Sequence, residues 1–161
     1  MLVVCLLAQY ASYAQGASCL PNEEIIFSFG TKNGRKAVLV RDKANGYLLY
    51  RFGTAQKTEL EFPGRKPDSW KAFTHSAYER GGGIQNEGMS LDYVFFTNNG
   101  YRYVLYQTYY ARGNQQRVGV KITNLATNKT TDIPGVLHTM RGSLGFFRGQ
   151  GLIAEGEELF E

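Results

Sequence analysis

The sequence predicts an all-β protein, built as a single antiparallel barrel or sandwich of about eight strands that are joined mostly by up-and-down hairpins. Three observations favour this class. Short apolar segments alternate with turn signals along most of the chain, Asn-Gly pairs fall between them, and aromatic residues make up 14% of a sequence with 19 glycines. A length of 161 residues fits one domain. We place this domain at residues 15–150, followed by an acidic tail at residues 151–161.

The first half of the chain predicts four strands, at residues 23–29, 35–42, 47–52 and 57–62. Asn33-Gly34 and Asn45-Gly46 separate the first three strands. Asn-Gly supplies the positive φ angles of tight turns, so both pairs are expected to be hairpin corners. Pro63-Gly64 ends the fourth strand.

The third and fourth strands can be paired residue by residue. Their apolar faces match if Tyr50 lies opposite Leu60, and Arg51 then lies opposite Glu59 on the other face. This register predicts a cross-strand salt bridge at a wet surface, worth a few tenths to ~1 kcal/mol.

The second half of the chain predicts further strands at residues 69–80, 89–96, 100–110, 117–125 and 129–133. A helix is the weaker alternative for the first of these segments. Thr97-Asn98-Asn99-Gly100 is the clearest hairpin turn of the chain. Beyond Pro134 the chain is expected to be irregular and glycine-rich, with room for one last strand or a short helix.

The N-terminus predicts export. Leu2 to Ala8 form an apolar stretch, and Ser12-Tyr13-Ala14 offers the small-x-small pattern that signal peptidase cleaves. Residues 1–14 are therefore expected to be a signal peptide, although no positive charge precedes the apolar stretch. The alternative is a buried N-terminal strand or short helix. The expected location is the periplasm or the exterior of the cell, and no apolar run reaches the length of a membrane span.

Cysteine usage and charge narrow the expected partners. Cleavage after Ala14 removes Cys5 and leaves Cys19 alone, so no internal disulfide is expected.

All 18 Lys and Arg lie beyond residue 14 and 4 of the 14 acidic residues lie in the tail, so residues 15–150 carry a net charge of 18 minus 10, or +8. A basic body suits an acidic protein or an anionic glycan. Export makes nucleic acid the least expected partner.

No set of residues predicts catalysis, a metal or a cofactor. Gly81-Gly82-Gly83 precede a strand rather than a helix, and no lysine lies between residues 72 and 120, so they do not make a phosphate-binding loop. His75 and His138 are the two histidines, and without a retained cysteine pair they do not make a metal site. A hydrolase on this scaffold would have to use His75 with Glu87 or Asp92.

A tyrosine- and arginine-rich strand beside the glycine-rich loop is the unusual feature of the chain. Residues 100–110 carry tyrosines on both faces of a strand, so one set can fill the core while the other is either covered or exposed. Exposed tyrosine and arginine are common in protein contacts. The expected contact residues are Arg80, Gly81, Gly82, Gly83, Arg102, Tyr106, Tyr110 and Arg112.

Three segments carry a resemblance to known proteins. GYLLYRFGTAQKTELEFP, YERGGGIQNEGMSLDYVFFTNNGYRYVLY and VGVKITNLATNKTTDI resemble a group of small exported proteobacterial proteins of unknown function, over roughly residues 20 to 135. Members of that group often carry a cysteine pair on the first hairpin. The matching positions here are Phe29 and Val40, so the resemblance implies a core that is stable without this disulfide.

The layout is also similar, more distantly, to periplasmic inhibitors of lysozyme, which are small β-barrels that insert a polar loop into the enzyme cleft. No residue of such a loop can be matched in this chain. We therefore expect an exported binding module that caps or inhibits another protein, such as a cell-wall hydrolase or a toxin. The alternatives are a structural envelope protein without a ligand and a hydrolase that uses His75.

Overall fold

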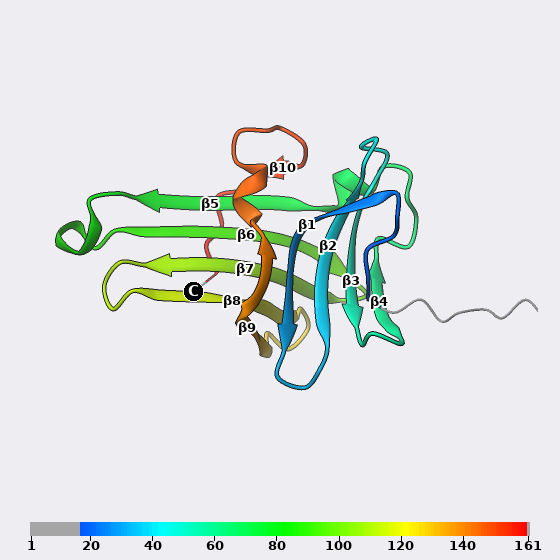
Figure 1. Ribbon diagram of the computed structural model, residues 1–161, viewed down its shortest axis with the longest axis horizontal. Coiled ribbons are helices and arrows are strands. Elements are labelled where there is room, and N and C mark those ends of the chain that lie inside the picture. Colours follow the sequence, from blue (N-terminus) through cyan, green and yellow to red (C-terminus); the bar gives the residue numbers. More distant parts are fainter. Residues whose placement is uncertain (1–16, 161) are drawn as a thin grey trace, which may run out of the picture.

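The computed structural model describes residues 17–160, which form one ten-stranded sheet that curls into a half-barrel (Figure 1). The signal peptide predicted at residues 1–14 lies outside the described residues. The strands are β1 (Glu23–Thr31), β2 (Lys36–Asp42), β3 (Leu48–Gly53), β4 (Thr58–Phe62), β5 (Thr74–Arg80), β6 (Met89–Asn98), β7 (Tyr101–Tyr110), β8 (Gln115–Asn124), β9 (Thr130–Gly142) and β10 (Ala154–Glu155). Three short 3-10 helices accompany them, η1 (Ser69–Ala72), η2 (Gly83–Asn86) and η3 (Leu144–Phe147).

The sheet consists of two meanders, β1–β4 and β5–β9, which are joined where β9 pairs with β1. The all-β prediction is confirmed, and no α-helix occurs between residues 17 and 160. The strand count of about eight was too low. The sheet is also not purely antiparallel, because β10 adds to β5 in the parallel direction. The hairpin at residues 97–100 is as predicted, with positive φ angles of 48° at Asn99 and 78° at Gly100.

The expectation of an irregular chain beyond Pro134 was wrong as far as Gly142, where β9 ends, whereas the short helix η3 and the short strand β10 follow it. Pro134 is tolerated because it lies opposite Gly119 at the point where β9 stops pairing with β8 and begins to pair with β1. Conversely, the strand expected at residues 69–80 begins only at Thr74, after η1.

The predicted register of β3 and β4 was wrong by two residues. Tyr50 lies opposite Phe62 and Arg51 lies opposite Glu61, although the apolar faces meet as expected. An irregularity between Phe52 and Gly53 contributes, because these neighbours lie opposite Leu60 and Thr58, which are two residues apart. A Cβ on Gly53 would lie 2.2 Å from the carbonyl oxygen of Lys57, so this close backbone approach requires glycine.

Apolar side chains pack on both faces of the sheet. The largest cluster lies on the inner face, where Leu144 and Phe147 of η3 pack against side chains from β1–β3 and β6–β8. Two smaller clusters lie on the outer face, one over β2 and β3 and one over β6 and β7. Short segments at each end of the described chain cover these outer clusters, through Cys19 and Phe160 respectively.

A buried ion pair fixes the N-terminal segment on the sheet. The guanidinium of Arg51 donates to both carboxylate oxygens of Glu23, at 2.6 and 2.8 Å, and its Nε donates to Glu61 at 2.6 Å. Arg51 also donates to the carbonyl oxygen of Ser18. Arg51 is therefore buried and shared between two glutamates, where the sequence predicted an exposed pair with Glu59. Glu59 instead pairs with Arg35.

Candidate functional site

The end of the sheet where β5 meets β6 and β7 meets β8 gathers most of the predicted contact residues. Arg80 ends β5, Gly81–Gly83 begin the following loop, Tyr110 ends β7 and Arg112 lies in the next turn. In Figure 1 the ends of these four strands stand clear of the rest of the molecule. We call this end, residues 80–88 and 110–114, the tip.

The other two predicted contact residues lie elsewhere. Arg102 is at the opposite end of β7, where it pairs with Thr97 and Thr123. Tyr106 lies in the middle of β7 and is buried on the outer face. The structure therefore brings six of the eight residues together and separates these two from them.

The loop at residues 81–88 has a defined conformation built on η2. The backbone N–H of Gly88 donates to the carbonyl of Gly83 at 2.7 Å, and the side-chain amide of Asn86 donates to the carbonyl of Gly81 at 2.8 Å. Gly82 and Gly83 have positive φ angles of 89° and 61°, which glycine adopts without strain. The loop is thus a compact turn between strands.

Two arginines tie this loop to the strands beneath it. Arg80 donates through Nε and Nη2 to the carbonyl oxygen of Glu87, at 3.0 and 2.9 Å. Arg112 donates to the Glu87 carboxylate at 3.1 Å. The N–H of Ala111 donates to the carbonyl of Gly88, which joins the loop to the β7–β8 turn. A small cavity of about 190 Å³ lies between these elements.

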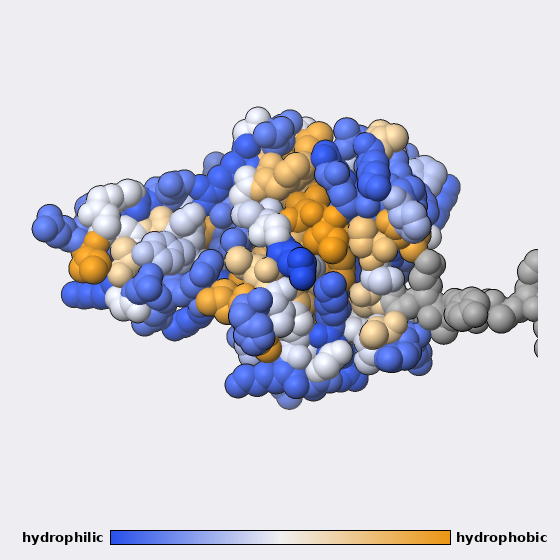
Figure 2. Space-filling view, in the orientation of Figure 1, coloured by the Kyte–Doolittle hydropathy of each residue, from blue (hydrophilic) through white to orange (hydrophobic). Residues whose placement is uncertain are grey.

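Ile84 lies in η2, within this ordered loop. Its side chain is 70% exposed, the largest value among the exposed large apolar residues of the described chain. Figure 2 shows the tip as a narrow projection with a mostly hydrophilic surface and an apolar spot near its end. Single exposed apolar residues are common on proteins. This one differs because hydrogen bonds hold its backbone in place and the strands carry it away from the body.

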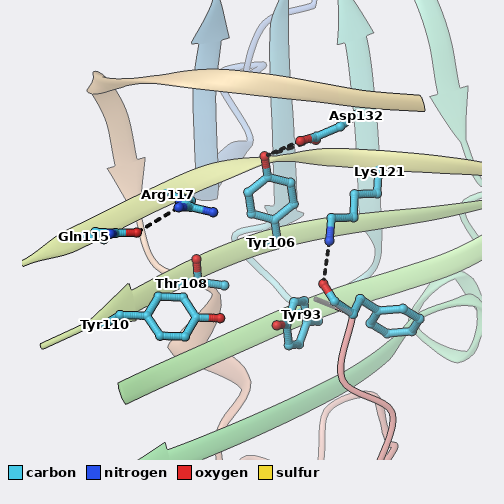
Figure 3. A pocket seen from close by; sticks show the side chains of 9 residues that line it. Tyr93, Tyr106, Thr108, Tyr110, Gln115, Arg117, Lys121 and Asp132 are labelled. Atoms are coloured by element: carbon cyan, nitrogen blue, oxygen red, sulfur yellow. Dashed lines mark hydrogen bonds between the residues drawn. The ribbon is translucent and has the colours of Figure 1, made fainter. Parts of the chain in front are cut away.

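A second recess lies on the outer face, around Tyr106 (Figure 3). Its volume is about 420 Å³. Its lining consists of Tyr93, Tyr106, Thr108, Tyr110, Gln115, Arg117, Lys121, Asp132 and Phe160. Burial raises the pKa of Tyr106, and the nearby carboxylate of Asp132 raises it further, so the phenol stays protonated and donates to Asp132 at 3.1 Å. We call this recess the outer pocket.

A third cluster lies on the inner face, where His75 meets Asp92. The Nε2 atom of His75 lies 3.2 Å from Asp92, and Arg148 donates to both Asp92 oxygens at 2.8 Å. Burial alone would raise the pKa of Asp92, but the hydrogen bonds from His75 and Arg148 outweigh it and lower the pKa below its usual value. Arg148 also pairs with Glu79. This network anchors the segment after η3 to the sheet.

The same cluster bears on the hydrolase alternative. Of the two carboxylates considered, Asp92 lies beside His75, whereas Glu87 is at the tip. His75 is buried, and no hydroxyl or thiol group within residues 17–160 hydrogen-bonds its ring. Without a nucleophile at the ring and with Asp92 neutralised by Arg148, the arrangement supports anchoring better than acyl transfer.

Residues 17–160 show neither a cluster of potential metal ligands nor a membrane-spanning helix. These residues contain no group of three or more His, Cys, Asp or Glu side chains that could hold a metal ion. Nor does this part of the chain hold a helix that is long and apolar enough to cross a membrane.

The chain matches no protein-family model, no curated protein and no solved structure.

The sequence analysis did not identify several residues of these sites, although the sequence pattern around two of them indicates a special role. Ile84 is the one aliphatic residue in an otherwise polar, glycine-rich loop. Gly119 interrupts an apolar strand, which often marks a close approach of another group. Arg148 had no such signal, because its partners Asp92 and Glu79 lie more than 50 residues away in sequence.

Proposed function

We propose that the protein is an exported module, located in the periplasm or outside the cell, that binds another protein through its tip and thereby caps or inhibits it. The observation that carries this proposal is the exposure of Ile84 on a loop whose backbone is held by hydrogen bonds. An ordered loop loses little conformational entropy when it binds. Ile84 can therefore act as an anchor that fills an apolar recess of the partner.

The charge of the tip suits a partner with an acidic rim. Arg80 and Arg112 flank the loop and share Glu87, which leaves two positive charges against one negative charge. Residues 15–150 carry +8 in total. A positive body speeds association with an acidic surface, and the effect weakens as salt rises. A cell-wall hydrolase or a toxin with an acidic cleft fits this description.

The proposed mechanism is steric. A narrow projection that carries one apolar side chain can enter a concave active site, whereas a flat sheet face cannot. Full burial of an isoleucine side chain contributes about 1.5 to 3 kcal/mol, equivalent to roughly ten- to hundredfold in affinity. Residues further back along β5–β8 would then form the rim of the contact.

A comparison of immobilised variants tests this proposal. Three versions of the chain from residue 15 onward are immobilised: the wild type, Ile84→Asp and Leu125→Asp. Each is incubated with envelope extract, and the proteins that it retains are identified by mass spectrometry. Leu125 is a matched control because it is 42% exposed and lies in the β8–β9 turn at the opposite end of the sheet. The proposal expects a stoichiometric protein that the wild type and Leu125→Asp retain and Ile84→Asp loses. If the three columns retain the same proteins, the tip is not the binding surface.

A further inference from the structure

The outer pocket is a second site, which shares Tyr110 with the tip, and its walls are aromatic. The rings of Tyr93, Tyr106, Tyr110 and Phe160 line it. Phe160 packs edge-on against Tyr93, with ring centroids 5.5 Å apart, and so forms one wall. A volume of about 420 Å³ lies within the range of small-molecule sites. Several rings around one recess favour a ligand with a flat apolar face.

Two cations project into the same recess from β8. Arg117 donates to the side-chain oxygen of Gln115 at 2.7 Å, and Lys121 donates to the carbonyl oxygen of Phe160 at 2.8 Å. Figure 3 shows both contacts at the rim of the pocket. These bonds orient the two side chains and leave most of their N–H donors available, since a guanidinium has five and an ammonium three. An anionic group of a ligand would therefore find donors at either cation.

Thr108 supplies a hydroxyl group to the pocket. The residue is only 7% exposed and lines the recess. A hydroxyl group can both donate and accept a hydrogen bond. Asp132 and Gln115, which line the same recess, add oxygen acceptors. The pocket thus offers both donors and acceptors for hydroxyl groups.

We propose that the outer pocket binds an acidic sugar, meaning a pyranose ring that carries a carboxylate. The tyrosine rings would pack against the C–H face of the sugar, Arg117 would bind the carboxylate, and Lys121 and Thr108 would hydrogen-bond hydroxyl groups. A neutral sugar leaves the two cations without an anion. A nucleotide or a free phosphate brings more negative charge beside Asp132, which disfavours it.

Calorimetric titration with two matched sugars tests this inference. Glucuronic acid and glucose share the same ring and differ at C6, which is a carboxylate in the acid. N-acetylmuramic acid and N-acetylglucosamine form a second pair, in which the acid carries its carboxylate on an added lactyl ether. We expect each acid to bind about tenfold or more tightly than its neutral counterpart, because hydrogen bonds to charged groups are the stronger ones. Binding of the acid should weaken as salt is raised.

Single substitutions test whether the sugar binds in the outer pocket. Arg117→Gln should weaken glucuronic acid about tenfold while leaving weak glucose binding unchanged. Arg102→Gln is the control, since Arg102 lies at the other end of the neighbouring strand β7 and outside the pocket lining. Ile84→Asp should not affect sugar binding, so this proposal and the one for the tip can fail independently. Equal affinity for acid and neutral sugar, an unaltered affinity in Arg117→Gln, or no binding of any of the four sugars at millimolar concentration would overturn it.

Discussion

The phenol ring of Tyr106 lies over Gly119 and reaches across β8 to Asp132 on β9. A Cβ on Gly119 would lie 2.3 Å from the Tyr106 hydroxyl oxygen, so this crossing depends on the absence of a side chain there. The hydroxyl donates to Asp132 at 3.1 Å. One glycine thus allows a side chain of β7 to fasten β9 to the sheet and to form a wall of the outer pocket.

A methyl group at position 119 should therefore be costly. We expect Gly119→Ala to lower the free energy of unfolding by about 1 to 3 kcal/mol, because the methyl group forces Tyr106 out of its place. Urea denaturation of the wild type and the variant measures the difference. Gly81→Ala is the control, since a Cβ there meets nothing within 4 Å. A change at position 119 no larger than the control would contradict this role for Tyr106.

Removal of Arg51 should destabilise the protein more strongly than removal of an exposed arginine. Arg51→Met leaves Glu23 buried without its cation, which costs about 3 to 5 kcal/mol. Arg35→Met breaks the partly exposed pair with Glu59 and should cost less than about 1 kcal/mol. Denaturant midpoints of the two variants provide the comparison, and similar losses in both would show that burial does not set the strength of the Arg51 pair.

Acid should weaken the fold through Asp92 and Glu23. Burial raises the pKa of each carboxyl group, but their hydrogen bonds outweigh burial and lower the folded-state pKa. The unfolded chain therefore takes up protons first. This stabilisation is present above the unfolded pKa values of about 4 and is lost as the pH falls through the folded values.

The free energy of unfolding, measured at a series of pH values between about 7 and 3, should therefore decline below about pH 4. Asp92→Asn removes one of these groups, so its curve should be less steep over this acid range, while Glu23 and the other carboxyl groups of lowered pKa, Asp42 and Asp68, account for a remaining slope. A variant curve parallel to that of the wild type would show that Asp92 contributes no such stabilisation.

The fold class could be predicted because its signals are local. Alternating apolar residues and Asn-Gly turns define most strands without reference to the rest of the chain, and Asn99 and Gly100 form their hairpin turn as expected. The β3–β4 register was missed because the irregularity at Gly53 depends on how closely the chain approaches Lys57. The first part of β9 was predicted at residues 129–133, but its continuation beyond Pro134 was missed, because proline is compatible with a strand only where the pairing changes.

The candidate sites could be predicted only in part. The predicted residues of the tip lie close to one another on two adjacent hairpins, so a glycine-rich loop and a tyrosine-rich strand indicated this region, although not Ile84. The outer pocket combines Tyr106, Lys121 and Phe160 from three distant segments. Its existence depends on where the C-terminal segment crosses the sheet, and a local pattern carries no information about this.

The affinity of the partner for the Ile84→Asp variant tests the central proposal most directly. The dissociation constant of the captured protein would be measured for the wild type, Ile84→Asp and Leu125→Asp, together with the thermal midpoint of each. We predict that Ile84→Asp weakens binding by roughly ten- to hundredfold or more, since burial of the isoleucine is lost and a charge is introduced. Leu125→Asp should bind like the wild type, and all three midpoints should agree within a few degrees. Binding by Ile84→Asp that equals the wild type would contradict a function carried by the tip.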